Sequence, residues 1–305
     1  MGRVPRRAEG LSRPRGGPPP DTIESLPSPL RHPELLRLRL AERRPVVFLD
    51  YDGTLTPIVA DPRSATLPAA TRREVERLAS RCPVAIVSGR DLRDVRAMVG
   101  LDSLVYAGSH GFDVGGTFGG RPLHAERGTE ALPALDRAER ALREELAELP
   151  GARVERKRLA IAVHVRGVDA GRVPEAEAAV ARAAEAEPDL RATSGKMVLE
   201  LWPALDWDKG AAVRWLLSML GLDRDDVVPV YVGDDATDED AFRALRDRGV
   251  GVVVGSAERP GATWARFALR DPSEVRAFLR VLAVAAEGEE ASPLAGRREP
   301  GRGRD

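Results

Sequence analysis

Short apolar runs alternate along the chain with longer stretches in which apolar residues recur every three or four positions. The short runs have the length of buried strands, and the longer stretches are typical of amphipathic helices. The predicted strands of this regular part are 45–49, 84–87, 104–106, 227–232 and 250–254. The predicted helices are 32–44, 70–81, 92–99, 209–220, 239–247 and 272–284. Such alternation through short loops indicates an α/β fold, a Rossmann-like parallel sheet covered by helices on both faces.

The alternation changes in the middle of the chain, after the glycine-rich stretch 115–120. Here the order is helix, two strands, helix, two strands, which predicts a small α+β module with an antiparallel sheet. Its predicted helices are 129–149 and 174–187, and its predicted strands are 153–155, 159–166, 190–193 and 196–202. We therefore expect an αββαββ domain inserted into a larger one. Ligand sites favour such domain interfaces.

These patterns define the expected domain boundaries. The core domain is predicted over 33–118 and 203–286, with the inserted domain at 119–202. Residues 1–32 are rich in Arg, Pro and Gly, and we expect a disordered basic tail there. Residues 287–305 are expected to be a second disordered tail.

Composition narrows the classes of partner. The formal net charge of −1 gives no reason to expect nucleic acid or a membrane surface as a partner. A single cysteine, Cys82, excludes an intramolecular disulfide framework and fits a reducing compartment. The sequence contains neither a run of 18 apolar residues nor the apolar core of a signal peptide. We expect a cytoplasmic protein.

The basic residues are almost all arginines. Of the 47 Lys and Arg residues, only Lys157, Lys196 and Lys209 are lysines. Lys differs from Arg where a compact ammonium must fit. The three lysines are therefore candidate functional groups, although chance survival explains any single one equally well.

Polar residues gather where predicted strands end or a predicted helix begins. Asp50 and Asp52 follow the strand 45–49, and side chains two apart point the same way along an extended chain. They are candidates for a nucleophile and an acid or base in one pocket, whereas an Asp-Gly turn is the simpler alternative. Three more polar segments lie at 88–90, 208–210 and 233–238.

Together these segments favour a phosphate site with a hard cation. Clustered carboxylates without a nearby Cys or His favour Mg²⁺, which keeps few protein ligands and uses substrate phosphate as well. Ser88 and Lys209 supply donors for phosphate oxygens.

The four segments resemble the four motifs of the haloacid dehalogenase superfamily of phosphatases. Fuller matches at 50–58 and 233–242, with others at 107–111, 162–166, 195–200 and 267–275, resemble the trehalose-6-phosphate phosphatase family. The resemblance spans roughly residues 42–285. It implies a core with an inserted cap of the C2B type. It also implies hydrolysis of trehalose 6-phosphate, a step of trehalose biosynthesis. A trehalose-phosphate synthase would then be a functional partner.

The resemblance also implies residue roles. Asp50 attacks phosphorus and becomes an aspartyl phosphate, and Asp52 protonates the departing sugar oxygen and then deprotonates water. Mg²⁺ is bound by Asp50, the backbone carbonyl of Asp52 and Asp234. Asp235 and Asp238 order its waters or hold Lys209.

Substrate-binding candidates lie in both domains. In the core they are Ser88, Gly89, Arg90 and His110, the last of which is equally compatible with a structural histidine. In the inserted domain they are Glu155, Lys157, Arg166, Lys196 and Glu200, paired by the period of two along their strands. Glu and Lys side chains accept from and donate to sugar hydroxyls. Solvated surface charge is the alternative for these strands.

Two positions depart from the family pattern. Trp202 stands where the family usually has Arg, and Asp113 where Glu is commoner.

Three rival functions stay open. One rival is a phosphatase for sucrose, mannosylglycerate or glucosylglycerate phosphates. Another is a hexose-phosphate mutase, which would return the phosphoryl group from Asp50 to the sugar. The third, an inactive sugar-phosphate sensor, would be expected to have lost Asp50, Asp52 or Asp234.

Overall fold

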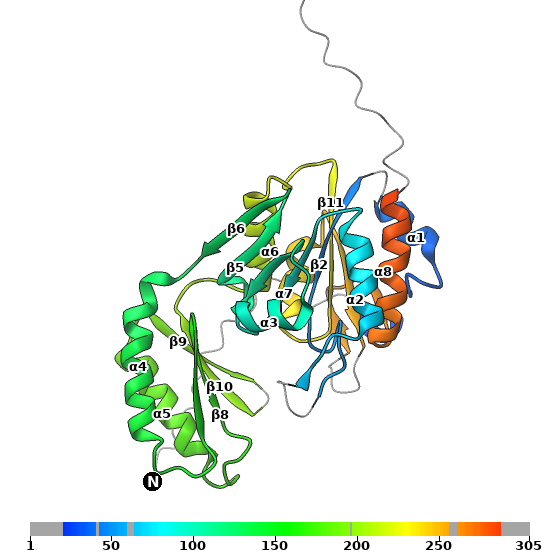
Figure 1. Cartoon of the computed structure of the whole chain (residues 1–305). Helices are drawn as coiled ribbons and strands as arrows, with labels where there is room; N and C mark the ends of the chain where they lie inside the picture. Colours follow the sequence, from blue (N-terminus) through cyan, green and yellow to red (C-terminus); the bar gives the residue numbers. More distant parts are fainter. Residues whose placement is uncertain (1–20, 41–42, 60–63, 196, 256–260, 288–305) are drawn as a thin grey trace, which may run out of the picture.

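Two β-sheets organise the protein, which is described here from a computed structural model (Figure 1). The structure describes residues 21–40, 43–59, 64–195, 197–255 and 261–287. The larger sheet has eight strands in the order β14-β12-β11-β2-β3-β4-β5-β6. They are β2 (Arg44–Leu49), β3 (Val84–Val87), β4 (Val105–Gly108), β5 (Asp113–Phe118), β6 (Arg121–Glu126), β11 (Val227–Gly233), β12 (Val250–Val254) and β14 (Phe267–Leu269).

The six strands from β14 to β4 run parallel, with β2 near the middle. Their side chains are buried on both faces because helices cover both, which explains their continuous apolar runs. One face packs against α1 (Pro33–Leu40), α2 (Ala69–Ala79), α3 (Leu92–Val99) and α8 (Pro272–Glu287). The other face packs against α6 (Lys209–Met219) and α7 (Asp238–Leu245). The α/β prediction for the core is confirmed.

The hairpin β5–β6 was not predicted from the sequence. β5 pairs antiparallel with both β4 and β6, so the hairpin extends the large sheet beyond β4. Glycine is rare in strands, yet β5 contains Gly115 and Gly116. Gly116 has a φ of +121°, and a Cβ there would lie 2.1 Å from the carbonyl oxygen of Leu104. Close approach to the neighbouring chain therefore requires glycine at this strand position.

The smaller sheet has four antiparallel strands in the order β7-β8-β10-β9. They are β7 (Arg153–Lys157), β8 (Ala160–His164), β9 (Leu190–Gly195) and β10 (Val198–Pro203). One face packs on α4 (Leu132–Glu145) and α5 (Val173–Ala186), as the alternating pattern of the sequence predicts. This layer stands beside the core and is reached through the hairpin β5–β6 (Figure 1).

Two features refine the expected boundaries. The boundary predicted between residues 118 and 119 falls in the turn of the hairpin β5–β6, and we propose that the inserted domain begins after Glu126 instead. Residues 21–32, expected within the disordered tail, include a short strand and a 3₁₀ turn. β1 (Asp21–Thr22) pairs with β13 (Ala262–Thr263), and the apolar side chains of Ile23, Leu26 and Leu30 pack on the core. Residues 1–20 and 288–305 lie outside the described residues.

Helix and strand ends otherwise differ from the predicted ones by a few residues. The helix expected to reach residue 44 ends at Leu40, since Arg44 already belongs to β2. The helix expected over 129–149 is a short 3₁₀ turn, Thr129–Ala131, followed by α4. None of the described helices combines the length and apolar character needed to cross a bilayer.

Candidate active site

The polar segments found in the sequence meet at one edge of the large sheet. Asp50 follows β2, Ser88 follows β3 and Asp234 follows β11, and these three strands are neighbours that run parallel. Lys209 begins α6, where the side chain of Asp208 caps the helix by accepting from the Ala211 backbone N–H at 2.7 Å. The carboxyl edge of an open parallel sheet is the common place for a ligand.

A buried ammonium lies at the centre of the site. Lys209 Nζ is 2.9 Å from Asp50 Oδ1, 2.7 Å from Asp238 Oδ1 and 3.7 Å from Asp235 Oδ1. Burial alone would lower the pKa of Lys209, but these three carboxylates outweigh it and raise the pKa well above its usual range. Lys209 is therefore a fixed positive charge beside Asp50.

Asp238 holds this ammonium with both of its oxygens engaged. Its Oδ1 also accepts from the Tyr231 hydroxyl at 2.6 Å, and its Oδ2 accepts from the Asp235 backbone N–H at 2.9 Å. Tyr231 was missed in the sequence, where its only signal is a hydroxyl within the apolar strand β11. Of the two roles expected for Asp238, the geometry favours holding Lys209.

Asp234 lies against the loop that follows Asp50. Thr54 donates from Oγ1 to Asp234 Oδ1 at 3.0 Å. Gly53, the residue before Thr54, has a φ of +80°, and a Cβ there would lie 2.1 Å from Asp234 Oδ2. Glycine at position 53 thus provides both the left-handed backbone and the space for the second carboxylate.

The buried carboxylates fit a divalent cation. Carboxylate oxygens of Asp50, Asp234 and Asp238 lie within 4.8 Å of one another. Burial raises the pKa of Asp50 well above its usual range although Lys209 opposes the shift. Burial, with Asp238 and Asp235 close by, raises the pKa of Asp234 to about 7. Oxygen donors that crowd together with raised pKa values are the donor set of a hard cation such as Mg²⁺.

Asp52 is half-exposed and is held by an arginine. Arg90 donates from Nε and Nη2 to the two oxygens of Asp52, both at 2.6 Å. The guanidinium also lies 5.6 Å from the centre of the Tyr51 ring. The Arg90 backbone N–H donates to Ser88 Oγ at 3.1 Å. The segment 88–90 therefore contacts Asp52 through the side chain of Arg90.

The loop after β4 is bonded to the same segment. Ser109 N–H donates to the Arg90 carbonyl at 2.6 Å, and His110 N–H donates to the Ser88 carbonyl at 2.8 Å. Ser109 and His110 have φ values of 50° and 55°, a region that non-glycine residues seldom adopt. Burial and the charge of Lys209 lower the pKa of His110 to about 4, so its ring is neutral at neutral pH.

The inserted domain presents a polar cluster to this loop. Lys157 Nζ lies 2.8 Å from Glu200 Oε1 and 3.5 Å from the Gly89 carbonyl oxygen. Trp202 Nε1 donates to Glu200 Oε2 at 3.3 Å, and Lys157 Nζ lies 5.5 Å from the centre of the Trp202 ring. The His110 ring meets Trp202 edge-on, with centroids 5.1 Å apart. Trp202 thus links the two domains through packing.

The other candidates of the inserted domain lie further along its sheet. His164 Nε2 and Glu155 Oε2 are 2.5 Å apart, and Glu155 and Glu200 both face Ala162 across the sheet. Arg166 is exposed beyond the end of β8. Lys196 lies outside the described residues.

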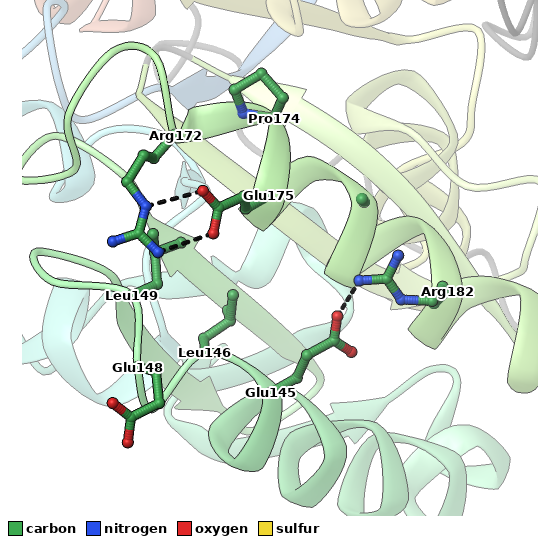
Figure 2. A pocket seen from close by; sticks show the side chains of 9 residues that line it. Glu145, Leu146, Glu148, Leu149, Arg172, Pro174, Glu175 and Arg182 are labelled. Carbon is green, nitrogen blue, oxygen red and sulfur yellow. Dashed lines mark hydrogen bonds and ion pairs between the residues drawn. The ribbon is translucent and has the colours of Figure 1, made fainter.

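A separate hollow of about 470 Å³ opens between the end of α4 and one side of α5 (Figure 2). Arg172 bonds Glu175, and Arg182 bonds Glu145, so four of the charged side chains along it are paired with one another (Figure 2). None of its lining residues belongs to the four polar segments. The hollow belongs to the outer layer of the inserted domain.

Comparison with known proteins gives one consistent result. Residues 48–273 match the family model described as trehalose-phosphatase. The chain is 43% identical over 285 residues to probable trehalose-phosphate phosphatase 9 of Oryza sativa subsp. japonica, covering 87% of this chain and 76% of the relative. It is 46% identical over 242 residues to a trehalose-phosphate phosphatase of Mycobacterium marinum, covering 79% of this chain and 62% of that relative.

Solved structures agree with these sequence matches. The fold matches the C-terminal domain of C. albicans trehalose-6-phosphate phosphatase with a TM-score of 0.67 and 26% identity, covering 85% of this chain and 98% of that one. A haloacid dehalogenase-like hydrolase from Bacteroides thetaiotaomicron, at 16% identity and a TM-score of 0.56, shares the fold.

Proposed function

The chain belongs to the trehalose-phosphatase family, and we propose that it hydrolyses trehalose 6-phosphate to trehalose and phosphate through a phosphoryl group carried on Asp50. The family places it among the phosphoric monoester hydrolases. The observation that carries the mechanism is the buried contact of Lys209 with both Asp50 and Asp238 at the carboxyl edge of the large sheet. A fixed ammonium at this place offsets the repulsion between an anionic nucleophile and an anionic phosphoryl group.

In the first step an Asp50 oxygen attacks phosphorus, and the bond from phosphorus to the sugar oxygen breaks. Asp52, two residues along the same loop, gives its proton to the departing oxygen, which leaves as the sugar hydroxyl. In the second step Asp52 takes a proton from water, the resulting hydroxide attacks phosphorus, and the bond to Asp50 breaks. Phosphate leaves, and both carboxyl groups return to their starting forms.

Lys209 and Ser88 serve the phosphoryl group in this proposal. Lys209 donates to Asp238, which is itself held by the Tyr231 hydroxyl, so the position of the ammonium changes little as charge moves onto the phosphate oxygens. Ser88 is buried at the end of the adjacent strand β3 and offers a hydroxyl donor. Arg90 is shared between Asp52 and the incoming phosphate, because a guanidinium has donors for both.

Asp50, Asp234 and the backbone carbonyl of Asp52 would hold Mg²⁺. Two buried carboxylates with raised pKa values provide the hard oxygen ligands that this ion prefers. The bound ion would supply positive charge toward the phosphoryl oxygens. Asp235, whose Oδ1 accepts from Thr237 and from the Asp238 backbone N–H, fixes the loop that carries Asp234.

The polar face of the small sheet would receive the sugar. Glu155 and Glu200 lie on either side of Ala162 across the sheet, so a small side chain separates two acceptor groups. Lys157 adds donors beside Glu200 and, by its 3.5 Å approach to the Gly89 carbonyl, links this face to the phosphate end. We assign Lys157, Glu200 and Glu155 to the disaccharide hydroxyls, with His110, Arg166 and Lys196 as further candidates.

A substrate panel scored by released phosphate tests this proposal. Trehalose 6-phosphate should be preferred over sucrose 6-phosphate, mannosylglycerate phosphate and glucosylglycerate phosphate when kcat/KM is compared. Formation of an isomeric sugar phosphate without phosphate release would instead indicate a mutase. Binding of trehalose 6-phosphate without turnover in the presence of Mg²⁺ would indicate a sensor. We also propose functional coupling to a trehalose-phosphate synthase, whose product would be the substrate of this site.

A further inference from the structure

Three side chains of kinds that can ligate a metal, Asp113, His124 and Glu126, gather on the hairpin β5–β6, apart from the Asp50 site. Asp113 lies directly opposite Glu126 in the pairing of the two strands, and His124 lies two residues before Glu126 on the same face. Ligand atoms of the three side chains lie within 4.8 Å of one another. Gly115 stands opposite His124, so no side chain competes for the space beside the imidazole.

Asp113 is the unusual member of this group. Its side chain is 91% buried, and its Oδ1 receives no hydrogen bond. His124 Nε2 lies 3.6 Å from that oxygen, beyond hydrogen-bonding distance. Burial and the neighbouring Glu126 raise the pKa of Asp113 to about 6. A buried carboxylate oxygen without a donor is unfavourable unless a cation satisfies it.

Glu126 connects the group to the inserted domain. It is the last residue of the hairpin, and Arg158 donates from Nε and Nη2 to its two oxygens at 2.8 and 3.2 Å. The Arg158 backbone N–H donates to Asp91 Oδ2 at 3.1 Å. The carboxylate of Glu126 is therefore both a candidate metal ligand and the acceptor of a contact between the two domains.

We propose that Asp113, His124 and Glu126 form a second cation site, selective for borderline divalent metals such as Zn²⁺, with water completing the coordination. One imidazole and two carboxylates suit Zn²⁺, whereas Mg²⁺ prefers oxygen ligands alone. Metal and Arg158 compete for Glu126, so occupancy of the site loosens the junction between the domains. The site is independent of phosphate chemistry, because none of its three ligands belongs to the Asp50 cluster.

Direct metal binding tests the site without relying on activity. The full chain carrying Asp234→Asn, which weakens the Asp50 site, is titrated with Zn²⁺ against a chromophoric chelator, and with Co²⁺ followed by visible absorption. We expect one bound ion per chain. Adding His124→Ala should weaken binding at least tenfold and remove the Co²⁺ absorption, and adding Asp113→Asn should weaken it as well.

A matched control is His32→Ala, since His32 also faces a carboxylate, Glu34, at 3.3 Å but belongs to no three-ligand group among the described residues. It should leave Zn²⁺ affinity unchanged. Equal effects of His32→Ala and His124→Ala, or no bound ion at all, would overturn the site. Circular dichroism of each variant establishes that it is folded.

The competition with Arg158 has its own readout. Arg158→Ala frees both oxygens of Glu126 and should tighten Zn²⁺ binding several-fold. Zn²⁺ should also raise the thermal unfolding midpoint of the Asp234→Asn protein but not that of Asp234→Asn/His124→Ala. Unchanged or weaker binding in Arg158→Ala would overturn the proposed link between the metal and the domain junction.

Discussion

Arg90 donates two hydrogen bonds of 2.6 Å to the two carboxylate oxygens of Asp52, so the proposed acid is held by the segment expected to bind phosphate. Burial disfavours the charge of Arg90, but the bonds to Asp52 outweigh it and raise the pKa of the guanidinium. Lysine cannot reproduce this fork. We therefore expect Arg90→Lys to lower kcat at least about tenfold, roughly 1.4 kcal/mol.

The loss in Arg90→Lys should appear with both trehalose 6-phosphate and p-nitrophenyl phosphate, because both present the same phosphate to the site. Initial rates on the two substrates measure it. Arg93→Lys is the matched control, since Arg93 is exposed on the helix that follows. A loss confined to the disaccharide phosphate would place Arg90 at the sugar instead.

Asp50→Asn should abolish turnover while the protein stays folded. An amide neither attacks phosphorus nor binds Mg²⁺ well, and the neutral group removes a buried charge whose pKa is already raised. Phosphate release and a thermal unfolding curve measure the two halves of this expectation. Asp226→Asn, a surface change beside Arg224, should leave activity intact. Residual activity within about tenfold of wild type, roughly 1.4 kcal/mol, would remove Asp50 from the role of nucleophile.

Lys209→Arg should lower kcat at least about a hundredfold, on the order of 2.7 kcal/mol. The ammonium is enclosed between Asp50 and Asp238, and the larger planar guanidinium donates in fixed directions. Steady-state kinetics give the change. The reciprocal substitution at the surface, Arg172→Lys, is the control and should have no effect. A nearly active Lys209→Arg enzyme would mean that the site accepts any cation at this place.

Trp202→Phe should raise KM for trehalose 6-phosphate several-fold with little change in kcat. Phenylalanine keeps the stacking on Phe112 but removes the indole N–H that donates to Glu200, which is then held by Lys157 alone. Hydrolysis of p-nitrophenyl phosphate, which lacks the sugar, should not change. Equal losses on both substrates would show that Trp202 supports the fold of the site as a whole.

Removal of Mg²⁺ should make stability depend on pH through Asp234. Its pKa is about 7 in the folded protein against 3.8 as the reference value, so the folded state binds more protons between these limits. Stability from this group is therefore present at low pH and declines as pH rises from about 4 to about 7, by at most about 1.4 kcal/mol per pH unit.

Thermal unfolding in EDTA at pH 5.5 and pH 8 measures the effect. Wild type should lose more stability between these pH values than Asp234→Asn, whose amide does not titrate. Added Mg²⁺ should restore wild type at pH 8 because the cation stabilises the ionised carboxylate. The same slope in both proteins would assign the pH dependence to other groups.

The large sheet and the place of the site were predictable because both depend on local patterns. Continuous apolar runs give buried parallel strands, and residues after such strands gather at one edge whatever the detailed packing. Asp50, Ser88 and Asp234 therefore lie where their strand ends predict. The hairpin β5–β6 was missed because glycine is required at position 116 by the close approach of the Leu104 backbone. This contact between distant segments leaves no local pattern in the sequence.

The sequence by itself determined which chemical groups reach the site: carboxylates at strand ends, one ammonium at a helix start, and a second module bearing Glu and Lys. Only the tertiary structure decided how they pair. Arg90 binds Asp52, Asp238 holds Lys209 and accepts from Tyr231, and Lys157 bonds Glu200. The physical reason is that secondary structure depends on neighbours in the chain, whereas these contacts join residues brought together from different strands, helices and loops, as in the 159 positions separating Asp50 from Lys209.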